Sequence, residues 1–398
     1  MRQRIAVIGV GTIGSQVLWH LSRRDCDVTG YELYSPGHSK GAAGGETRLF
    51  RTLELEDLDY LPVVNRADEL WRRLEEDSGR RLRDISGSLV IGDANAPNTR
   101  TALEGVELND REYRVCTREE ALREFPEFGL DESDIVIWDK DGGTIKPELS
   151  VNTAAGLAEA NGVRIARGSR VTAVEQTDSG SVRVVVDGES HEYDRVVVTP
   201  GAWVSRLLPE LSDLFMMRRL VNVWFFGKSA HSLTSILPYI RTEPAYSYGL
   251  PVPDRTAMKI GLGFSHHLPI DSPDEAPLRV DEKDLKPFIA HARRYIPVLD
   301  EYPMRVSTYF EGYTHSRHEF VQEHPTMDNV FVMAGFSGHG FKMSPAMGEV
   351  GADWATDRPP RVDTTFLRRK APRAPQPSGA APGTDAREAA APAPVEGA

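Results

Sequence analysis

The sequence predicts an α/β fold in which a parallel β-α-β unit at the N-terminus precedes a larger antiparallel sheet. Residues 4–9 (RIAVIG) form the short apolar run of a buried strand, residues 13–22 fit a helix, and residues 28–32 (VTGYE) fit the next strand. Residues 220–320 alternate in polarity and contain many aromatic side chains, which is typical of antiparallel strands. Together these observations favour a mixed α/β (α+β) architecture over an all-helical or all-β one.

The same patterns predict the remaining elements. Helices are expected at 58–76, 149–161 and 345–356, and strands at 89–91, 135–138, 170–176, 181–186, 195–199 and 329–334. Residues 33–47 are rich in Gly, Ser and Ala and are expected to form a loop. Residues 371–398 consist mainly of Ala, Pro and Gly, cannot bury enough apolar surface to fold, and are expected to be a disordered tail.

Composition excludes several classes of protein. The 398 residues, of which 40% are hydrophobic, are enough for two domains, and the net charge of −12 argues against a nucleic-acid partner. The two cysteines, Cys26 and Cys116, lack metal-type spacing, so we expect free, buried thiols and no metal site. No apolar stretch is as long as a membrane span, and residues 1–4 lead directly into a strand. We therefore expect a cytoplasmic enzyme without a signal peptide.

The turn between the first strand and the first helix carries a glycine-rich motif. It has the form GxGxxG and consists of Gly9, Val10, Gly11, Thr12, Ile13 and Gly14. Glycines allow a tight turn and close approach of a pyrophosphate, which the N–H groups of the helix N-terminus can bind. Glu32 ends the second strand, where its carboxylate can accept hydrogen bonds from the adenosine ribose hydroxyls. The unit therefore predicts a Rossmann-like dinucleotide-binding domain.

A second glycine-rich segment favours FAD over NAD. The first motif does not separate the two cofactors, but an NAD enzyme would continue as regular β-α units, whereas this chain continues into a loop and sheet-like segments. The strand at 329–334 leads into Gly335-Phe336-Ser337-Gly338-His339-Gly340 and a helix. A second helix N-terminus near the cofactor stabilises negative charge on a reduced flavin.

Four separated segments also carry a family resemblance. They are 9–32, 38–51 (HSKG and GETRLFR), 199–203 (TPGAW) and 334–342 (AGFSGHGFK). On these segments the chain resembles the D-amino-acid-oxidase superfamily, specifically the branch of monomeric sarcosine oxidase and N-methyltryptophan oxidase. The resemblance covers roughly residues 4–360.

The resemblance implies a discontinuous domain organisation. An FAD-binding domain would comprise 1–86, 146–216 and 318–365, and a substrate domain 87–145 and 217–317, with its antiparallel sheet covering the flavin ring. Further cofactor contacts would come from His38, Thr47, Arg48, Val171, Gly201, Gly335, Gly338, His339, Gly340 and Lys342.

The resemblance also implies a substrate site. Arg51 and Lys342 match the pair that holds the substrate carboxylate, which suits an Arg fork beside an ammonium. Tyr248 and Tyr313 match aromatic residues of the pocket, and Glu56 matches an acidic residue near the arginine.

Two basic residues are expected to act on the flavin side. Arg48 matches an arginine near the flavin ring, and Lys259 follows Tyr248 at the spacing of the lysine that promotes reaction with O2. A cation there would stabilise developing superoxide. The alternative is that Lys259 is only an outward-facing residue of a strand.

The sequence departs from the family at several positions. Glu311 stands where the family has the cysteine that binds its flavin covalently, so we expect non-covalent FAD. Gly263 stands where an active-site histidine is expected, unless a gap moves His266 or His267 into place. A serine and histidines of the family are replaced by Ala42, Ala43 and Gly44. These losses would remove bulk and polarity and favour a different, larger substrate.

The implied reaction is oxidation of a C–N bond beside a carboxylate. A small amino acid or N-alkyl amino acid would pass a hydride equivalent to FAD, the imine would hydrolyse, and O2 would be reduced to H2O2. Two alternatives stay open. One is a dehydrogenase of the same fold that uses another electron acceptor, and the other is a flavin-binding homologue without turnover, which the losses at Glu311 and Gly263 favour.

Overall fold

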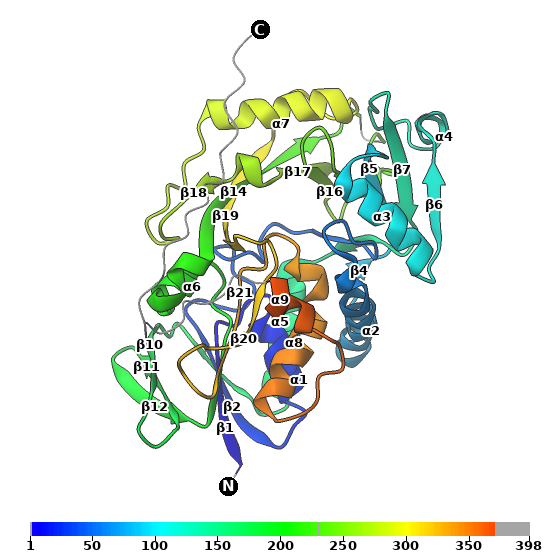
Figure 1. Ribbon diagram of the computed structural model, residues 1–398. Helices are drawn as coiled ribbons and strands as arrows, with labels where there is room; N and C mark the ends of the chain where they lie inside the picture. The colour runs from blue at the N-terminus through cyan, green and yellow to red at the C-terminus, as the bar shows by residue number, and fades with distance from the viewer. Residues whose placement is uncertain (1, 230, 371–398) are drawn as a thin grey trace, which may run out of the picture.

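The computed structural model describes residues 2–229 and 231–370, and the tail expected at 371–398 lies outside the described residues. Figure 1 shows two regions, with the N-terminal β-α-β unit in the lower one and an antiparallel sheet beneath helix α7 (Glu282–Tyr295) in the upper one. This mixed α/β arrangement is the one that the sequence predicts.

A six-stranded sheet forms the centre of the lower region. Its order is β20-β21-β13-β1-β2-β9, all parallel except β20. The strands are β1 (Gln3–Ile8), β2 (Cys26–Glu32), β9 (Arg164–Arg167), β13 (Arg195–Val198), β20 (Phe320–Glu323) and β21 (Val330–Ala334). Ile5 and Val7 pack into one core while Ala6 and Ile8 pack into another, so β1 is buried on both faces. Burial on both faces explains the uninterrupted apolar run.

Helices cover one face of this sheet and a small sheet covers the other. The helices are α1 (Gly14–Leu21), α5 (Pro147–Ala160) and α8 (Gly340–Ala355), with α2 (Leu61–Ser78) packed on α8 and preceded by the turn η1 (Leu58–Tyr60). The opposite face carries β10 (Val171–Gln176), β11 (Val182–Val186), β12 (Glu189–Tyr193) and α6 (Val204–Leu207).

The upper region is built on a nine-stranded sheet of order β18-β14-β17-β16-β15-β5-β7-β6, with β19 paired to β14. The strands are β5 (Ser88–Asp93), β6 (Tyr113–Cys116), β7 (Asp134–Asp139), β14 (Phe215–Phe226), β15 (Tyr239–Arg241), β16 (Ser247–Pro251), β17 (Ala257–Leu262), β18 (Leu268–Pro269) and β19 (Arg305–Thr314). Helices α3 (Pro97–Leu108), α4 (Arg118–Glu124) and α7 flank it (Figure 1). A small sheet of β3 (Arg48–Phe50), β8 (Gly143–Ile145) and β4 (Arg83–Asp84) joins the two regions, and α9 (Thr365–Lys370) ends the described chain.

The structure corrects three expectations. The helix expected from residue 345 begins at Gly340, and Pro345 lies inside it, because tertiary packing keeps a helix that the missing N–H only interrupts locally. Helices α3, α4 and α7 were not anticipated. Both cysteines are free, but only Cys116 is buried, and Cys26 is partly exposed.

The domain division stays a proposal. The strands of the six-stranded sheet all come from the segments assigned to the FAD-binding domain. Strand β8, however, belongs to a segment assigned to the substrate domain and pairs with β3 and β4 of the other.

Candidate active site

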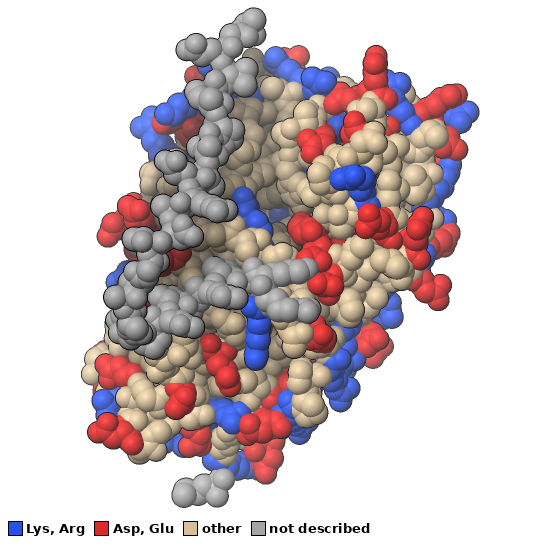
Figure 2. Space-filling view, in the orientation of Figure 1, with Lys and Arg blue, Asp and Glu red and all other residues tan. Residues whose placement is uncertain are grey.

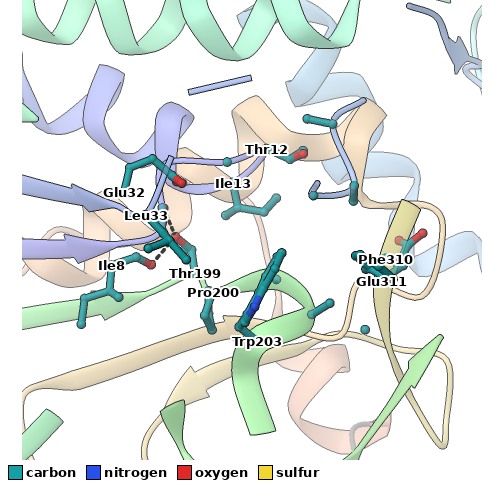
Figure 3. A pocket seen from close by; sticks show the side chains of 18 of the residues that line it. Ile8, Thr12, Ile13, Glu32, Leu33, Thr199, Pro200, Trp203, Phe310 and Glu311 are labelled. Atoms are coloured by element: carbon teal, nitrogen blue, oxygen red, sulfur yellow. Dashed lines mark hydrogen bonds between the residues drawn. The ribbon is translucent and has the colours of Figure 1, made fainter. Parts of the chain in front are cut away.

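A long cavity opens at the carboxyl ends of β1 and β2, where α1 begins. It encloses about 1750 Å³, open solvent at its mouth included. Figure 3 shows Glu32 and Leu33 at one end, Phe310 and Glu311 at the other, and the Trp203 side chain between them. Ligands of open α/β sheets bind at this end of the strands.

The glycine motif fits a dinucleotide for steric reasons. Gly9 has φ +87°, and a Cβ there would lie 2.5 Å from the carbonyl oxygen of Thr199. A Cβ on Gly14 would lie 1.9 Å from the carbonyl oxygen of Gly9. Gly11 has no atom near its Cβ direction and lines the cavity, so a phosphate can approach its backbone. These residues therefore fit the pyrophosphate of FAD.

The carboxylate of Glu32 is held in place by backbone donors. Its oxygens accept hydrogen bonds from the N–H groups of Val10 and Tyr34, both at 2.9 Å, and the imidazole of His38 lies 3.4 Å away. Burial alone would raise the pKa of Glu32, but the hydrogen bonds from His38 and the two N–H groups lower it. The anion is therefore fixed where a ribose would bind.

Most of the expected cofactor residues line this cavity. Those that do are Gly9, Gly11, Thr12, Ile13, Glu32, His38, Arg48, Val171, Gly201, Gly335, Gly338 and Gly340. Val10 and Gly14 belong to the glycine turn without lining the cavity, and the carbonyl oxygen of Thr47 accepts a hydrogen bond from Lys259. His339 and Lys342 line the neighbouring cavity instead.

The second cavity encloses about 1420 Å³ with its open solvent and shares one wall with the first. Both are lined by Ala42, Arg48, Phe310, Glu311, Gly338 and Phe341. A molecule in the second cavity therefore lies next to one end of whatever fills the first.

Arg51 and Lys342 come together in this second cavity, but each has an acidic partner. The Arg51 guanidinium lies 2.7 Å from Glu56, and the Lys342 ammonium lies 2.6 Å from Glu54. Burial would raise the pKa of Glu56, but Arg51 and Lys342 hold it well below its usual range. Burial, reinforced by Arg51, lowers the pKa of Lys342. The inner end of the cavity is thus charge-balanced.

His267 lies in the second cavity beside Tyr313. It is one of the two histidines that a sequence gap could move to the position of the expected active-site histidine. The Tyr313 hydroxyl lies 3.0 Å from Nδ1 of His267, and Nε2 lies 2.8 Å from the carbonyl oxygen of Leu262. A carbonyl only accepts, so Nε2 carries the proton and Tyr313 donates to Nδ1. Burial lowers the pKa of His267 to about 4, which keeps the ring neutral.

Tyr248 also lines the cavity. Its hydroxyl donates to Asn222 at 2.9 Å, and burial raises its pKa to about 12. It therefore stays protonated near neutral pH.

Lys259 is fully buried in β17, so it is not an outward-facing residue. Its ammonium donates hydrogen bonds to the carbonyl oxygens of Gly45, at 2.8 Å, and of Thr47. Burial and then Arg48 lower its pKa well below the usual value. Lys259 lines neither the first nor the second cavity. Its ammonium is bound instead by the backbone of residues 45–47.

Tyrosine residues pack against two of the glycines where we expected lost bulk. A Cβ at Gly44 would lie 2.5 Å from the ring of Tyr309, and a Cβ at Gly263 would lie 2.9 Å from Tyr246. Both tyrosines line the cavity and carry hydroxyl groups. The space beside Gly44 and Gly263 is therefore occupied, and the expectation of a different, larger substrate stays a prediction.

Glu311 lies on the wall between the cavities. Its carboxylate accepts a hydrogen bond from the N–H of Gly338 at 2.8 Å. Burial raises its pKa, and the charge of Arg48 opposes that rise. A carboxylate therefore faces both cavities at the position where the resembled family carries a cysteine thiol.

Sequence reasoning missed Tyr246, Glu54 and Arg317. Tyr246 lies two residues before Tyr248, and strand alternation could have placed both on one face. Glu54 lies in the irregular segment after Arg51, where no period applies.

Comparison with known proteins decides the assignment. Residues 4–354 match the model of a family described as FAD dependent oxidoreductase. The chain belongs to this family. It is an FAD-dependent oxidoreductase, and the suspected kinship with the amino-acid oxidases is confirmed.

Two curated relatives cover nearly the whole chain. A monomeric sarcosine oxidase of Streptomyces avermitilis is 29% identical over 88% of this chain and 93% of its own length. An N-methyl-L-tryptophan oxidase of Citrobacter koseri is 28% identical over 92% and 98%.

Solved structures show the same fold. NikD, an unusual amino acid oxidase of nikkomycin biosynthesis, superposes with a TM-score of 0.78 at 22% identity, covering 92% of this chain and 97% of its own. The L-proline dehydrogenase of P. horikoshii gives 0.79 at 19% identity, covering 92% and 96%. Among residues 2–229 and 231–370, no helix has the length and apolar character to cross a membrane, and no acidic, His or Cys cluster suits a metal ion.

Proposed function

We propose that the protein is an amine or amino-acid oxidase that oxidises the C–N bond beside a carboxylate to an imine and uses O2 as electron acceptor. One observation carries the proposal: a cavity that fits FAD shares the wall of Arg48, Glu311 and Gly338 with a cavity that contains Arg51 and Lys342. The relatives named for sarcosine and N-methyl-L-tryptophan support this substrate class.

The residues of the first cavity would hold FAD without a covalent bond. The backbone around Gly11 would bind the pyrophosphate, Glu32 the ribose, and the N-terminal end of α8 near Gly340 would face the ring end. FAD supplies the two-electron oxidation of the amine, and the protein supplies orientation and electrostatics.

The residues of the second cavity would orient the substrate. The planar guanidinium of Arg51 can take a carboxylate as a bidentate partner once Glu56 gives way, with Lys342 adding charge behind it. Tyr248 and Tyr313 would line the path of the amine, and burial raises the pKa of both hydroxyls, which keeps them protonated.

The setting of Lys259 favours a second candidate. The lysine donates to two backbone carbonyls and its pKa is lowered, so its cation is less available to O2 than a lysine on the cavity wall would be. A dehydrogenase that passes electrons to another acceptor therefore remains the alternative.

The test uses the purified holoenzyme with its visible absorption as readout. N-methyl and primary amino acids are mixed with it without oxygen, and then air is admitted. Loss of the flavin absorption followed by H2O2 equal to the substrate consumed supports an oxidase. Bleaching that persists in air supports the dehydrogenase, and no bleaching by any amino acid contradicts both.

A further inference from the structure

On one side of the second cavity, two guanidinium groups lie against the ring of the lining residue Phe264. Arg317 lines the cavity, and its guanidinium carbon lies 3.4 Å from the ring centroid of Phe264 and 5.2 Å from that of Tyr313. The guanidinium of Arg218 lies 4.3 Å from the Phe264 centroid. Figure 2 shows a hollow in the surface below the position of α7, with Lys or Arg atoms visible inside it.

Neither guanidinium has an acidic partner among the described residues. Burial and the neighbouring charge of Arg218 lower the pKa of Arg317. Arg218 reaches only the carbonyl oxygen of His267, at 3.4 Å, and its buried Nε has no hydrogen-bond partner. Glu311 is opposite Arg218 in the β14–β19 register, but its carboxylate binds the N–H of Gly338 instead.

Within residues 2–229 and 231–370, the guanidinium of Arg317 makes no hydrogen bond. The hydrogen bonds of Arg317 to these residues use its backbone, which donates to Thr314 and accepts from His339. That backbone has φ +66°, a conformation that is unfavourable for a side-chain-bearing residue and that the structure must hold in place. Stacking uses the flat face of a guanidinium and leaves its N–H edge able to bind a planar anion with two hydrogen bonds.

The end of the second cavity that contains Arg51 and Lys342 differs in its charge balance from the side that contains Arg317. The cations of Arg51 and Lys342 each lie within 2.7 Å of a carboxylate, that of Glu56 or that of Glu54. The uncompensated positive charge therefore lies at Phe264, where two like charges repel and a bound anion would relieve the repulsion.

We propose that Arg317, supported by Arg218, forms a subsite for a second anionic group of the substrate. The preferred substrates are then amino acids or N-alkyl amino acids whose side chain or N-substituent carries a carboxylate or a phosphate-type group. This inference rests on the proposed function, because it takes the amino-acid end of the substrate to bind near Arg51.

Ligand binding tests the subsite without turnover. The holoenzyme is titrated with glutarate, with its monoamide 4-carbamoylbutanoate, and with 3-phosphonopropanoate, and the change in flavin absorption is recorded. The parent is expected to bind glutarate about tenfold or more tightly than the monoamide, the effect of one charge-assisted pair. The phosphonate arm distinguishes a phosphate-type from a carboxylate preference.

Variants assign the preference to residues. Arg317→Met should remove it and leave monoamide binding unchanged, and Arg218→Met should weaken it. Arg279→Met is the matched control, because that side chain is 88% exposed and pairs with Asp281. Equal binding of glutarate and monoamide by the parent, or an undiminished preference in Arg317→Met, overturns the subsite. If Arg317→Met does not fold, the parent comparison and Arg218→Met decide. A glutarate preference with no flavin bleaching by any amino acid would retain the subsite and reject the proposed function.

Discussion

The ammonium of Lys342 lies 2.6 Å from the carboxylate of Glu54, and neither side chain is more than 4% exposed. Arg51 is paired with Glu56 at 2.7 Å, although the Glu56 side chain is 24% exposed. The two cations proposed to hold a substrate carboxylate are therefore neutralised before any substrate enters. Binding must redistribute this charge, which makes the acidic partners as informative as the cations.

Glu54→Gln should make the fold depend on an anionic ligand. The change keeps the shape but leaves the buried Lys342 without its partner, which costs about 3–5 kcal/mol of unfolding free energy. A bound carboxylate should restore part of this, so saturating propionate should raise the melting temperature of the variant more than that of the parent. Glu69→Gln is the control, because the Glu69 side chain is 61% exposed and also pairs with a cation, Arg66. Equal shifts in Glu54→Gln and the parent would contradict the assignment.

Arg51→Met should weaken carboxylate binding and spare the flavin. Truncating one member of a charged pair that is shielded from water typically costs about 2–5 kcal/mol. The dissociation constant of a carboxylate ligand should therefore rise about thirtyfold or more. FAD content, measured by absorbance after gel filtration, should stay that of the parent. Esters and decarboxylated analogues should be poor substrates of the parent, and an amine turned over as well as its acid would show that the clamp is misassigned.

Lys259→Met should separate the two half-reactions. Removing the cation should slow reoxidation of the reduced flavin by air about a hundredfold or more and change anaerobic reduction by substrate much less. Stopped-flow traces of each half-reaction measure this. Equal slowing of both would make Lys259 structural, and no change in either would favour the dehydrogenase.

The same residue predicts a pH dependence of reoxidation. Burial and Arg48 lower the pKa of Lys259, so its cation is present at low pH and is lost as pH rises through the lowered pKa. Reoxidation by the parent should therefore slow toward alkaline pH, while Lys259→Met should show no such slope. A slope of equal size in both would assign it to another group.

Glu32→Ala should weaken FAD binding about tenfold or more, because it removes a charge-assisted hydrogen bond to the ribose. It also removes the acceptor of the Val10 and Tyr34 N–H groups, so the loop itself should loosen. Equilibrium dialysis measures the loss. A variant that purifies fully loaded and retains FAD through dialysis would show that the ribose is held elsewhere.

FAD should be released by denaturation. Glu311 stands at the shared wall, and both cysteines, Cys26 and Cys116, are free. Acid precipitation should leave yellow FAD in the supernatant. Flavin that remains with the pellet, on a residue located by mass spectrometry, would disprove this.

The parts of the fold that depend on local pattern could be predicted from the sequence. Strand β1, the turn at Gly9 and the acidic end of β2 at Glu32 follow from apolar runs, glycine spacing and one charge within a single β-α-β unit. The start of α8 could not be placed, because Pro345 reads as a helix beginning, and only packing of the flanking turns shows otherwise.

The chemistry of the second cavity needed the three-dimensional structure. His267 reaches Tyr313 only through the turn after β17, so residue spacing alone left Gly263, His266 and His267 as alternatives. The pairing of Glu54 with Lys342 joins residues almost three hundred positions apart, and no periodicity reports on such a contact.

The tyrosines packed on glycines also affect how the substrate range can change. Besides the pairs described above, a Cβ at Gly261 would lie 2.0 Å from the ring of Tyr248. A single methyl group added at such a glycine would force the ring above it to move. The shape of the cavity thus depends in part on glycines behind its wall, such as Gly44 and Gly261, which do not line it. Selection or engineering can change the cavity by substituting these glycines, while every side chain that lines it keeps its identity.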